Sequence, residues 1–111
     1  MVDYFYSVAG SSEAQRKVRG SRFIGKAFGI TNERGGDDLV VQVRKSLHDA
    51  THHCFAYRLG ADGRHCRTND DGEPSGTAGL PILQQIDARH LSNTIVVVTR
   101  YYGGTKLGRG G

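Results

Sequence analysis

The feature that most constrains the fold of this chain is the apolar run Ile95–Val98, which lies inside the longer segment 93–102. The run consists of β-branched residues and shows no alternation of apolar and polar side chains. Such a run is typical of a central strand that is covered on both faces. A chain of 111 residues has room for one modest hydrophobic core around that strand. We therefore expect one domain that comprises residues 1–111.

The start of the chain predicts a pair of strands. Residues 3–10 and 21–30 are rich in aromatic and β-branched side chains, as strands are. We expect them to pair in antiparallel fashion and to be joined by a long polar turn, residues 11–20.

A helix is predicted next, after a break at the glycine-containing residues 32–36. Asp37 or Asp38 can cap the N-terminus of this helix. Its apolar side chains recur at helical spacing and form one stripe, which consists of Leu39, Val40, Val43 and Leu47.

The second half of the chain predicts a hairpin, a loop and another helix. Residues 50–60 and 64–70 are the strands of the hairpin, joined by residues 61–63, and residues 70–79 have the composition of a loop. Pro81 has no backbone N–H, so the helix must begin within about a turn before it. The apolar side of this helix consists of Ala78, Ile82, Leu83 and Ile86.

The order of these elements indicates the fold class. Two strands, a helix, two strands, a helix and the final strand predict an α/β (α+β) two-layer sandwich. We expect a mixed sheet of four to five strands, with both helices packed on one of its faces.

The two cysteines are not expected to form a disulfide. If Asp62 and Gly63 form a two-residue turn, Cys66 lies opposite Leu59 and away from Cys54. Free thiols are typical of a reducing compartment. No stretch has the length of a membrane span and none is typical of a signal peptide, so we expect a cytoplasmic protein with no membrane partner.

The net charge of +4 is unevenly distributed along the chain. Residues 1–87 contain all 11 acids and 11 of the 15 lysines and arginines, so their charges cancel. Residues 88–111 contain no acid, and their cations are Arg89, Arg100, Lys106 and Arg109. This asymmetry indicates either an anionic partner or a solvated cationic surface.

The last twelve residues combine glycines, cations and tyrosines. Backbone N–H groups that are free of side chains can line an anion-binding nest beside cations. Tyr101 or Tyr102 can present a ring on which a base stacks. The candidate anion, nucleic-acid or partner-binding residues are therefore Arg100, Tyr101, Tyr102, Gly103, Gly104, Lys106, Gly108 and Arg109. The alternative is a turn whose glycines only satisfy positive φ angles.

A second loop, residues 69–79, contains three acids. Asp70, Asp71 and Glu73 could gather a divalent ion, although their spacing differs from that of an EF-hand loop. The acids could instead pair with the cations of the final loop. Gly72, Pro74 and Gly76 are ordinary turn residues. Ser75 does not have the spacing of a nucleophile elbow, and Ser75 or Thr77 can cap the helix that follows.

The histidines do not predict a metal site. His53 and Cys54 are neighbours on one strand, so their side chains point to opposite faces. His65 and Cys66 have the same relationship on the partner strand. Four converging ligands, which zinc usually needs, are not indicated. We expect no metal, no cofactor and no catalytic residue.

Three segments resemble the amino-terminal domain of the YigZ/IMPACT family. They are "DATHHCFAYRLG", "DDGEPSGTAGLPIL" and "NTIVVVTRYYGGTKLGRGG", and with "SRFIGKA" the resemblance extends from Arg19 onward. Asn69 stands where the family usually has serine. The family continues after "GRGG" into a helix that begins "L-V-R-A-Y", so we expect the carboxy-terminal helix and any second domain to be absent from this chain.

The resemblance carries implications for fold and partners. The family's fold is similar to the second domain of ribosomal small-subunit protein five. Bacterial relatives carry an additional ferredoxin-like domain, and nucleic-acid or ribosome binding is the usual inference for them. Eukaryotic relatives act in translational control by competing for a protein partner of a starvation-sensing kinase.

Together these observations predict a non-enzymatic, translation-associated binding module. We expect it to contact RNA or the ribosome through the basic glycine-rich loop. A protein-interaction module in translational regulation is the alternative. A phosphate-handling enzyme ranks third, because the serine-rich phosphate loop of the kinases that share the broad fold is absent.

Overall fold

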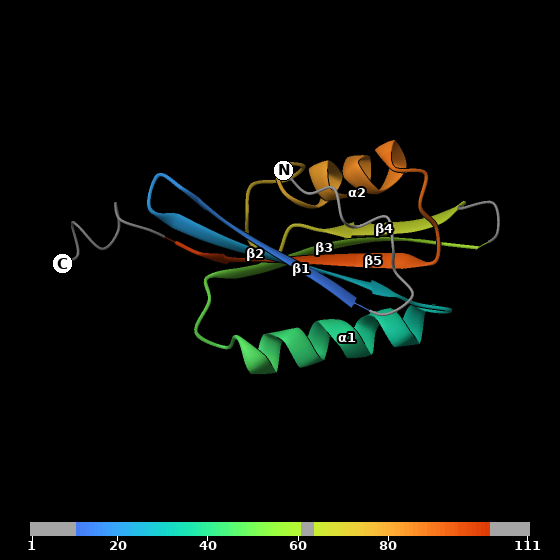
Figure 1. The fold of residues 1–111 in the computed structure, drawn as a ribbon, viewed down its shortest axis with the longest axis horizontal. Helices are drawn as coiled ribbons and strands as arrows, with labels where there is room; N and C mark the ends of the chain where they lie inside the picture. The colour runs from blue at the N-terminus through green and yellow to red at the C-terminus, as the bar shows by residue number, and fades with distance from the viewer. Residues whose placement is uncertain (1–10, 61–63, 103–111) are drawn as a thin grey trace.

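The structure is a computed structural model, and it describes residues 11–60 and 64–102 (Figure 1). Five strands and two helices follow one another along the chain. In chain order they are β1 (Ser11–Val18), β2 (Ser21–Gly29), α1 (Glu33–Ser46), β3 (His52–Leu59), β4 (His65–Asn69), α2 (Gly79–Ala88) and β5 (Thr94–Tyr101). The predicted α+β class is confirmed. No helix among the described residues is long and apolar enough to cross a membrane.

The five strands form one sheet in the order β1-β2-β5-β3-β4, and every neighbouring pair is antiparallel. The expectation of a mixed sheet was wrong. Helix α1 joins β2 to β3, which run in the same direction but have β5 between them. Helix α2 likewise joins β4 to β5 across β3. Strands of the same direction are therefore never adjacent.

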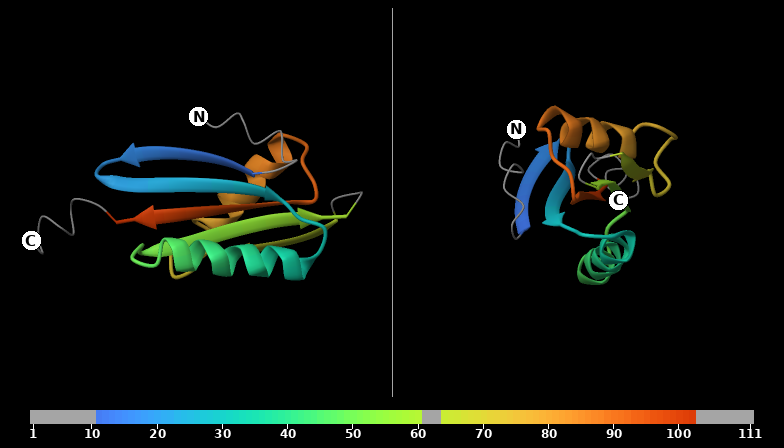
Figure 2. Two further views of the ribbon diagram at one scale, coloured as in Figure 1. Left: turned by 60° about the horizontal axis from the view of Figure 1, so that its bottom comes forward. Right: turned by 90° about the vertical axis from the view of Figure 1, so that its right-hand side faces the viewer.

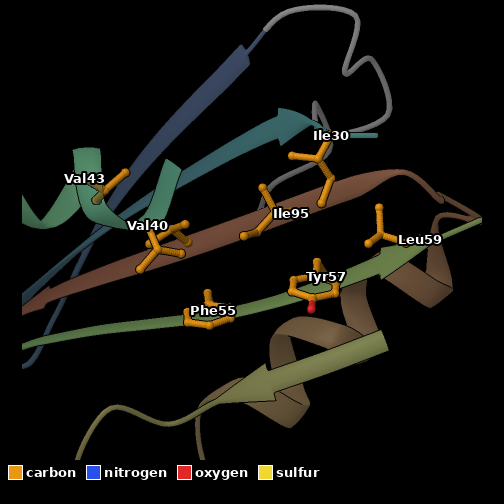
Figure 3. Close-up of a cluster of buried hydrophobic side chains, with 8 residues drawn as sticks. Ile30, Val40, Val43, Phe55, Tyr57, Leu59 and Ile95 are labelled. Carbon is orange, nitrogen blue, oxygen red and sulfur yellow. The ribbon is translucent and has the colours of Figure 1, made fainter. Parts of the chain in front are cut away.

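The helices cover opposite faces of the sheet, so the expected two-layer sandwich was also wrong (Figures 1 and 2). On the α1 face, Ile95 and Val97 of β5 belong to one buried cluster, shown in Figure 3. On the α2 face, Val96 belongs to a second cluster with Ile82 and Ile86 of α2. Because β5 is apolar on both faces, a helix on one face alone would leave the other row exposed to water.

Helix α1 begins earlier than predicted. Asn32 is its N-cap, and the Asn32 side-chain oxygen accepts the backbone N–H of Gly35 at 2.8 Å. Asp37 and Asp38 are therefore inside the helix. Gly36 is buried, and a methyl group there would lie 3.4 Å from the Ile30 side chain. Residues 32–36 thus form a cap and a first turn that approaches the sheet closely, where a break was expected.

The segment 11–20, which was expected to be a turn, contains strand β1. Its partner is β2, as Ser11 pairs with Phe28 and Val18 with Ser21. The turn is confined to Arg19 and Gly20, which have φ angles of 52° and 85°. Positive φ at both positions is typical of a two-residue hairpin turn. The strand predicted at residues 3–10 lies outside the described residues.

The β3–β4 hairpin is confirmed, but its register differs from the prediction by one residue. Cys66 pairs with Arg58, and Leu59 pairs with His65. A two-residue turn leaves an even number of residues between paired positions, whereas five separate Leu59 from His65. Both cysteines are free; Cys54 is buried and Cys66 is exposed.

Helix α2 matches its prediction, because it begins two residues before Pro81 and buries Ile82, Leu83 and Ile86. Its first residue, Gly79, touches β4. A methyl group at Gly79 would lie 2.8 Å from the backbone nitrogen of Asn69 and 2.9 Å from the Thr68 Cβ.

We predict that Gly79→Ala lowers the free energy of unfolding by about 1–3 kcal/mol, because helix and strand must separate to admit the methyl group. The matched control is Gly35→Ala, whose methyl group would meet nothing closer than 3.5 Å. That substitution lies in a helix and should stabilise the protein by about 0.5–1 kcal/mol. Urea denaturation of the three proteins measures both effects. Equal stabilities of the two variants would contradict the close contact.

Candidate functional site

The loop between β4 and α2 is held by its first acid. The Asp70 carboxylate accepts backbone N–H groups from Gly76 at 2.9 Å, Ala78 at 3.1 Å and Gly79 at 2.7 Å. These hydrogen bonds, that of Gly79 foremost, hold the pKa of Asp70 below its ordinary value. Asp70 therefore accepts the N–H of the first residue of α2, Gly79, and that of the N-cap, Ala78, from a distance in sequence.

The predicted caps Ser75 and Thr77 do not have this role. The N-cap of α2 is Ala78, and it makes no side-chain capping bond. The Thr77 hydroxyl donates to the backbone oxygen of Pro74. Asp70 was not predicted as the cap because capping residues are sought next to the helix. Asp70 lies at the start of the loop and approaches the helix because the loop folds back.

The second acid fastens the loop to β3 and α1. The Asp71 carboxylate accepts the backbone N–H of His53 at 2.8 Å and the Arg44 guanidinium at 3.1 Å. Burial alone would raise the pKa of Asp71, but these two donors outweigh it and the pKa lies below its ordinary value. Asp71 and Gly72 both have positive φ angles, 45° and 89°, as the tight turn requires.

The third acid meets the end of β5. One guanidinium nitrogen of Arg100 lies 2.9 Å and 3.0 Å from the two carboxylate oxygens of Glu73. The same guanidinium lies against two aromatic rings, 4.6 Å from the centroid of Tyr102 and 5.6 Å from that of Phe23. The sequence allowed pairing between this loop and the final segment, and the structure brings Glu73 and Arg100 together. Asp71 instead pairs with Arg44 of α1.

The two histidines of β3 are neighbours on the strand, so their side chains lie on opposite faces of the sheet. His52 donates Nδ1–H to the backbone oxygen of Asp71 at 2.7 Å, and its Nε2 lies 3.8 Å from Glu73. The buried His53 places Nδ1 3.1 Å from the Thr99 hydroxyl. Burial, and secondarily the charge of Arg44, lowers the pKa of His53. In the part of the chain that the structure describes, no group of three His, Cys, Asp or Glu side chains is placed to hold a metal ion.

A pocket of about 390 Å³ lies on the α2 face beside this network. Its wall is largely apolar, and the Glu73–Arg100 pair contributes the charged part. Burial, followed by the nearby acids, raises the pKa of the Cys54 thiol to about 12, so this thiol is protonated at neutral pH. The lining residues are Phe23, Cys54, Glu73, Thr77, Ala78, Ile82, Val98 and Arg100.

The structure also brings a set of cations to the end of β5 that the sequence analysis overlooked. Strand β2 pairs with β5 so that Arg22 lies opposite Tyr101 and Phe23 opposite Arg100. The exposed cations of the β1–β2 hairpin, Arg16, Lys17, Arg19 and Arg22, thus lie at the same end of the sheet. They were missed because their charge was summed with distant acids over residues 1–87.

Of the candidate residues in the final segment, the structure describes three. Tyr102 is 40% exposed, and the Tyr101 hydroxyl donates to Asp49 at 3.1 Å. Gly103, Gly104, Lys106, Gly108 and Arg109 lie outside the described residues, and their role stays a prediction.

The Impact N-terminal domain model matches residues 19–111 of this chain. The chain belongs to the IMPACT family. It is 40% identical over 111 residues to IMPACT family member YvyE of Bacillus subtilis, covering 100% of this chain and 51% of that protein. It is also 40% identical over 97 residues to IMPACT family member YigZ of Escherichia coli, covering 86% of this chain and 48% of that protein.

Solved structures of similar proteins share the fold of this IMPACT-family domain. The crystal structure of a hypothetical protein has a TM-score of 0.84 and 36% identity, covering 87% of this chain and 48% of that one. The two-domain translational regulator Yih1 has a TM-score of 0.62 and 28% identity, covering 88% and 40% respectively. The chain spans about half the length of the curated bacterial relatives that it matches.

We predict that Asp70→Ala lowers the thermal midpoint of the domain and speeds hydrogen exchange of the Gly76, Ala78 and Gly79 amides. These amides lose their acceptor in the variant. Ser75→Ala is the matched control in the same loop and should leave both properties unchanged. Amide exchange measured by NMR distinguishes the two, and equal exchange in both variants would show that Asp70 is not the cap.

A second prediction concerns pH. Because the pKa of folded His53 lies below the unfolded value of 6.5, the unfolded chain binds the proton more readily. The stability that neutral His53 allows is therefore complete above about pH 6.5 and is lost as the pH falls through the folded-state pKa.

The expected result is that His53→Asn flattens the loss of stability below about pH 6.5, because the titrating ring is gone. His48→Asn, at an exposed position, should keep the wild-type profile. Denaturant midpoints measured across this range test the assignment. A wild-type slope in His53→Asn would assign the pH dependence to another group.

Proposed function

We propose that this domain acts in translational regulation as a non-enzymatic binding module that contacts RNA, free or within the ribosome. The contact surface is the end of β5 together with the basic glycine-rich segment that follows it. A similar solved protein, Yih1, is a translational regulator, which supports the regulatory part of the proposal.

The observation that carries the RNA contact is the charge and aromatic character of this end of the chain. Residues 88–111 contain four cations and no acid. Tyr102 is exposed beside the Arg100 guanidinium, and Tyr101 lies beside Arg22. Aromatic rings beside cations suit a nucleic acid, because the bases stack and the phosphates release counterions on binding.

The roles of the acidic loop support a binding module over an enzyme. Asp70 accepts three backbone N–H groups, Asp71 holds Arg44 and the N–H of His53, and Glu73 holds Arg100. Each carboxylate is thus engaged in fixing the loop. The raised pKa of Cys54 likewise disfavours a thiolate nucleophile.

A protein partner in translational control is the second candidate. The largely apolar pocket on the α2 face favours it, since an apolar side chain of a partner could be anchored beside Phe23 and Ile82. A complex that survives nuclease treatment and is lost in Phe23→Ala, while the RNA affinity stays unchanged, would favour this function.

We predict that a labelled single-stranded RNA binds the protein in a salt-dependent manner. In Lys106→Gln/Arg109→Gln the slope of log affinity against log salt should fall by about 1.4, because two phosphate contacts are lost. Affinity at 0.1 M salt should fall about 25-fold by the same counterion argument.

The matched control is Arg34→Gln/Lys45→Gln, which removes two exposed cations from α1. It should bind as the wild type does. Fluorescence anisotropy at several salt concentrations measures all three proteins. Absence of binding by the wild type at low salt would overturn the RNA assignment.

A further inference from the structure

The tip of the β1–β2 hairpin, residues 16–22, concentrates cations in a way that the rest of the sheet does not. The chain turns at Arg19 and Gly20, which places Lys17 directly opposite Arg22 and Arg16 opposite Phe23. All four cations of the tip are exposed. Figure 2 shows the tip at the same end of the sheet as the end of β5.

This arrangement opposes the stability of the hairpin. Side chains directly opposite each other on antiparallel strands have Cβ atoms about 5 Å apart, and like charges there are destabilising. Among the described residues, no carboxylate lies within 4.0 Å of the charged groups of Arg16, Lys17, Arg19 or Arg22. The one acid of β1, Glu13, lies 3.9 Å from Lys26 instead.

Elsewhere on the sheet the pattern is the reverse. Arg58 pairs with Asp87 at 2.7 Å, Arg67 approaches Asp37 at 3.9 Å and Arg100 pairs with Glu73. Cations on the other strands thus have acids close to them, whereas Lys17 and Arg22 at the tip lie opposite each other. A local conflict of this kind is expected where a sequence serves binding in place of stability.

We propose that the hairpin tip is an anion-binding surface that holds RNA phosphates. This inference rests on the proposed function and extends its contact surface from the end of β5 across β2 to β1. The Arg22 guanidinium lies 5.2 Å from the centroid of the Tyr101 ring, so the tip is continuous with the end of β5. The phosphates neutralise the opposed cations and relieve their repulsion.

The composition of the tip favours a phosphate backbone over a protein partner. Its large exposed apolar side chain is Val18, and the rest of the exposed surface is cationic or glycine. Protein interfaces usually have an apolar core and few charges at their centre. Phosphate contacts, in contrast, come chiefly from arginine and lysine.

The first test compares Arg16→Gln/Lys17→Gln with the wild type and with Arg34→Gln/Lys45→Gln, which removes the same charge from α1. The probe is labelled single-stranded RNA, followed by fluorescence anisotropy as a function of salt. The tip variant should bind about 25-fold more weakly at 0.1 M salt, with a slope lower by about 1.4. The α1 variant should bind as the wild type does.

A charge reversal separates loss of binding from loss of folding. Lys17→Glu places a carboxylate opposite Arg22, so its thermal midpoint should equal or exceed that of the wild type. Its RNA affinity should nevertheless fall at least about 5-fold, since one phosphate contact is lost and an acid is added.

The outcomes distinguish this inference from the proposed function. If the wild type binds RNA, Lys106→Gln/Arg109→Gln weakens binding and both tip variants bind like the α1 control, the tip inference is overturned and the proposed function stands. If the wild type binds no RNA, both are overturned. Binding of an acidic protein through the tip, with no binding of RNA, also overturns the inference.

Discussion

Strand β5 is the element on which the rest of the structure depends. Its backbone is hydrogen-bonded to β2 along one edge and to β3 along the other, and its side chains are buried on both faces of the sheet. A helix on one face alone would leave the apolar side chains of the other face exposed to water, so a helix covers each face of the sheet. Because β5 contacts a strand along each edge and a helix on each face, the positions of its last residues are well defined. Arg100 and Tyr101 take their positions from the same ladder that fixes Val96 and Val97.

The acidic loop, residues 69–79, holds the surface beside the end of β5 in one arrangement. Asp70 ties the loop to the start of α2, Asp71 ties it to β3 and α1, and Glu73 ties it to Arg100 on β5. These three acids thereby attach the loop to four different elements. The loop has the acidic composition of a catalytic or metal-binding loop, but its acids mainly hold the loop in place. Its effect on binding is indirect, because it sets where the guanidinium of Arg100 and the ring of Tyr102 lie.

The sequence predicted those parts of the fold whose patterns are local. The apolar run of β5, the stripe that contains Ile82 and Ile86, and the β3–β4 hairpin are each visible in one short stretch of sequence. Strand β1 was missed because an exposed edge strand needs no apolar alternation, and Ser11–Val18 has little. The start of α1 was missed because Gly35 and Gly36 are typical of breaks, whereas the buried Gly36 permits a close contact with Ile30. The placement of the helices on opposite faces depends on the order of the strands in the sheet, which no single segment of the sequence determines. The apolar residues on both faces of β5 did indicate cover on both faces.

In the candidate site, too, features that lie close together in sequence were predicted, whereas features that depend on strand pairing were not. The cations of the final segment lie in one stretch of sequence without acids, residues 88–111, so the charge asymmetry was visible from composition. The cations of the hairpin tip are some eighty residues away and became part of the same surface only through the pairing of Arg22 with Tyr101. Their charge is cancelled in a sum along the chain by acids that, in space, are occupied elsewhere: Asp71 with Arg44, Glu73 with Arg100 and Asp87 with Arg58. Net charge is thus a poor guide to the electrostatics of this domain. Because the acids pair with other cations, the cations of the hairpin tip have no carboxylate within 4.0 Å among the described residues, and that end of the sheet is where a polyanion would be attracted.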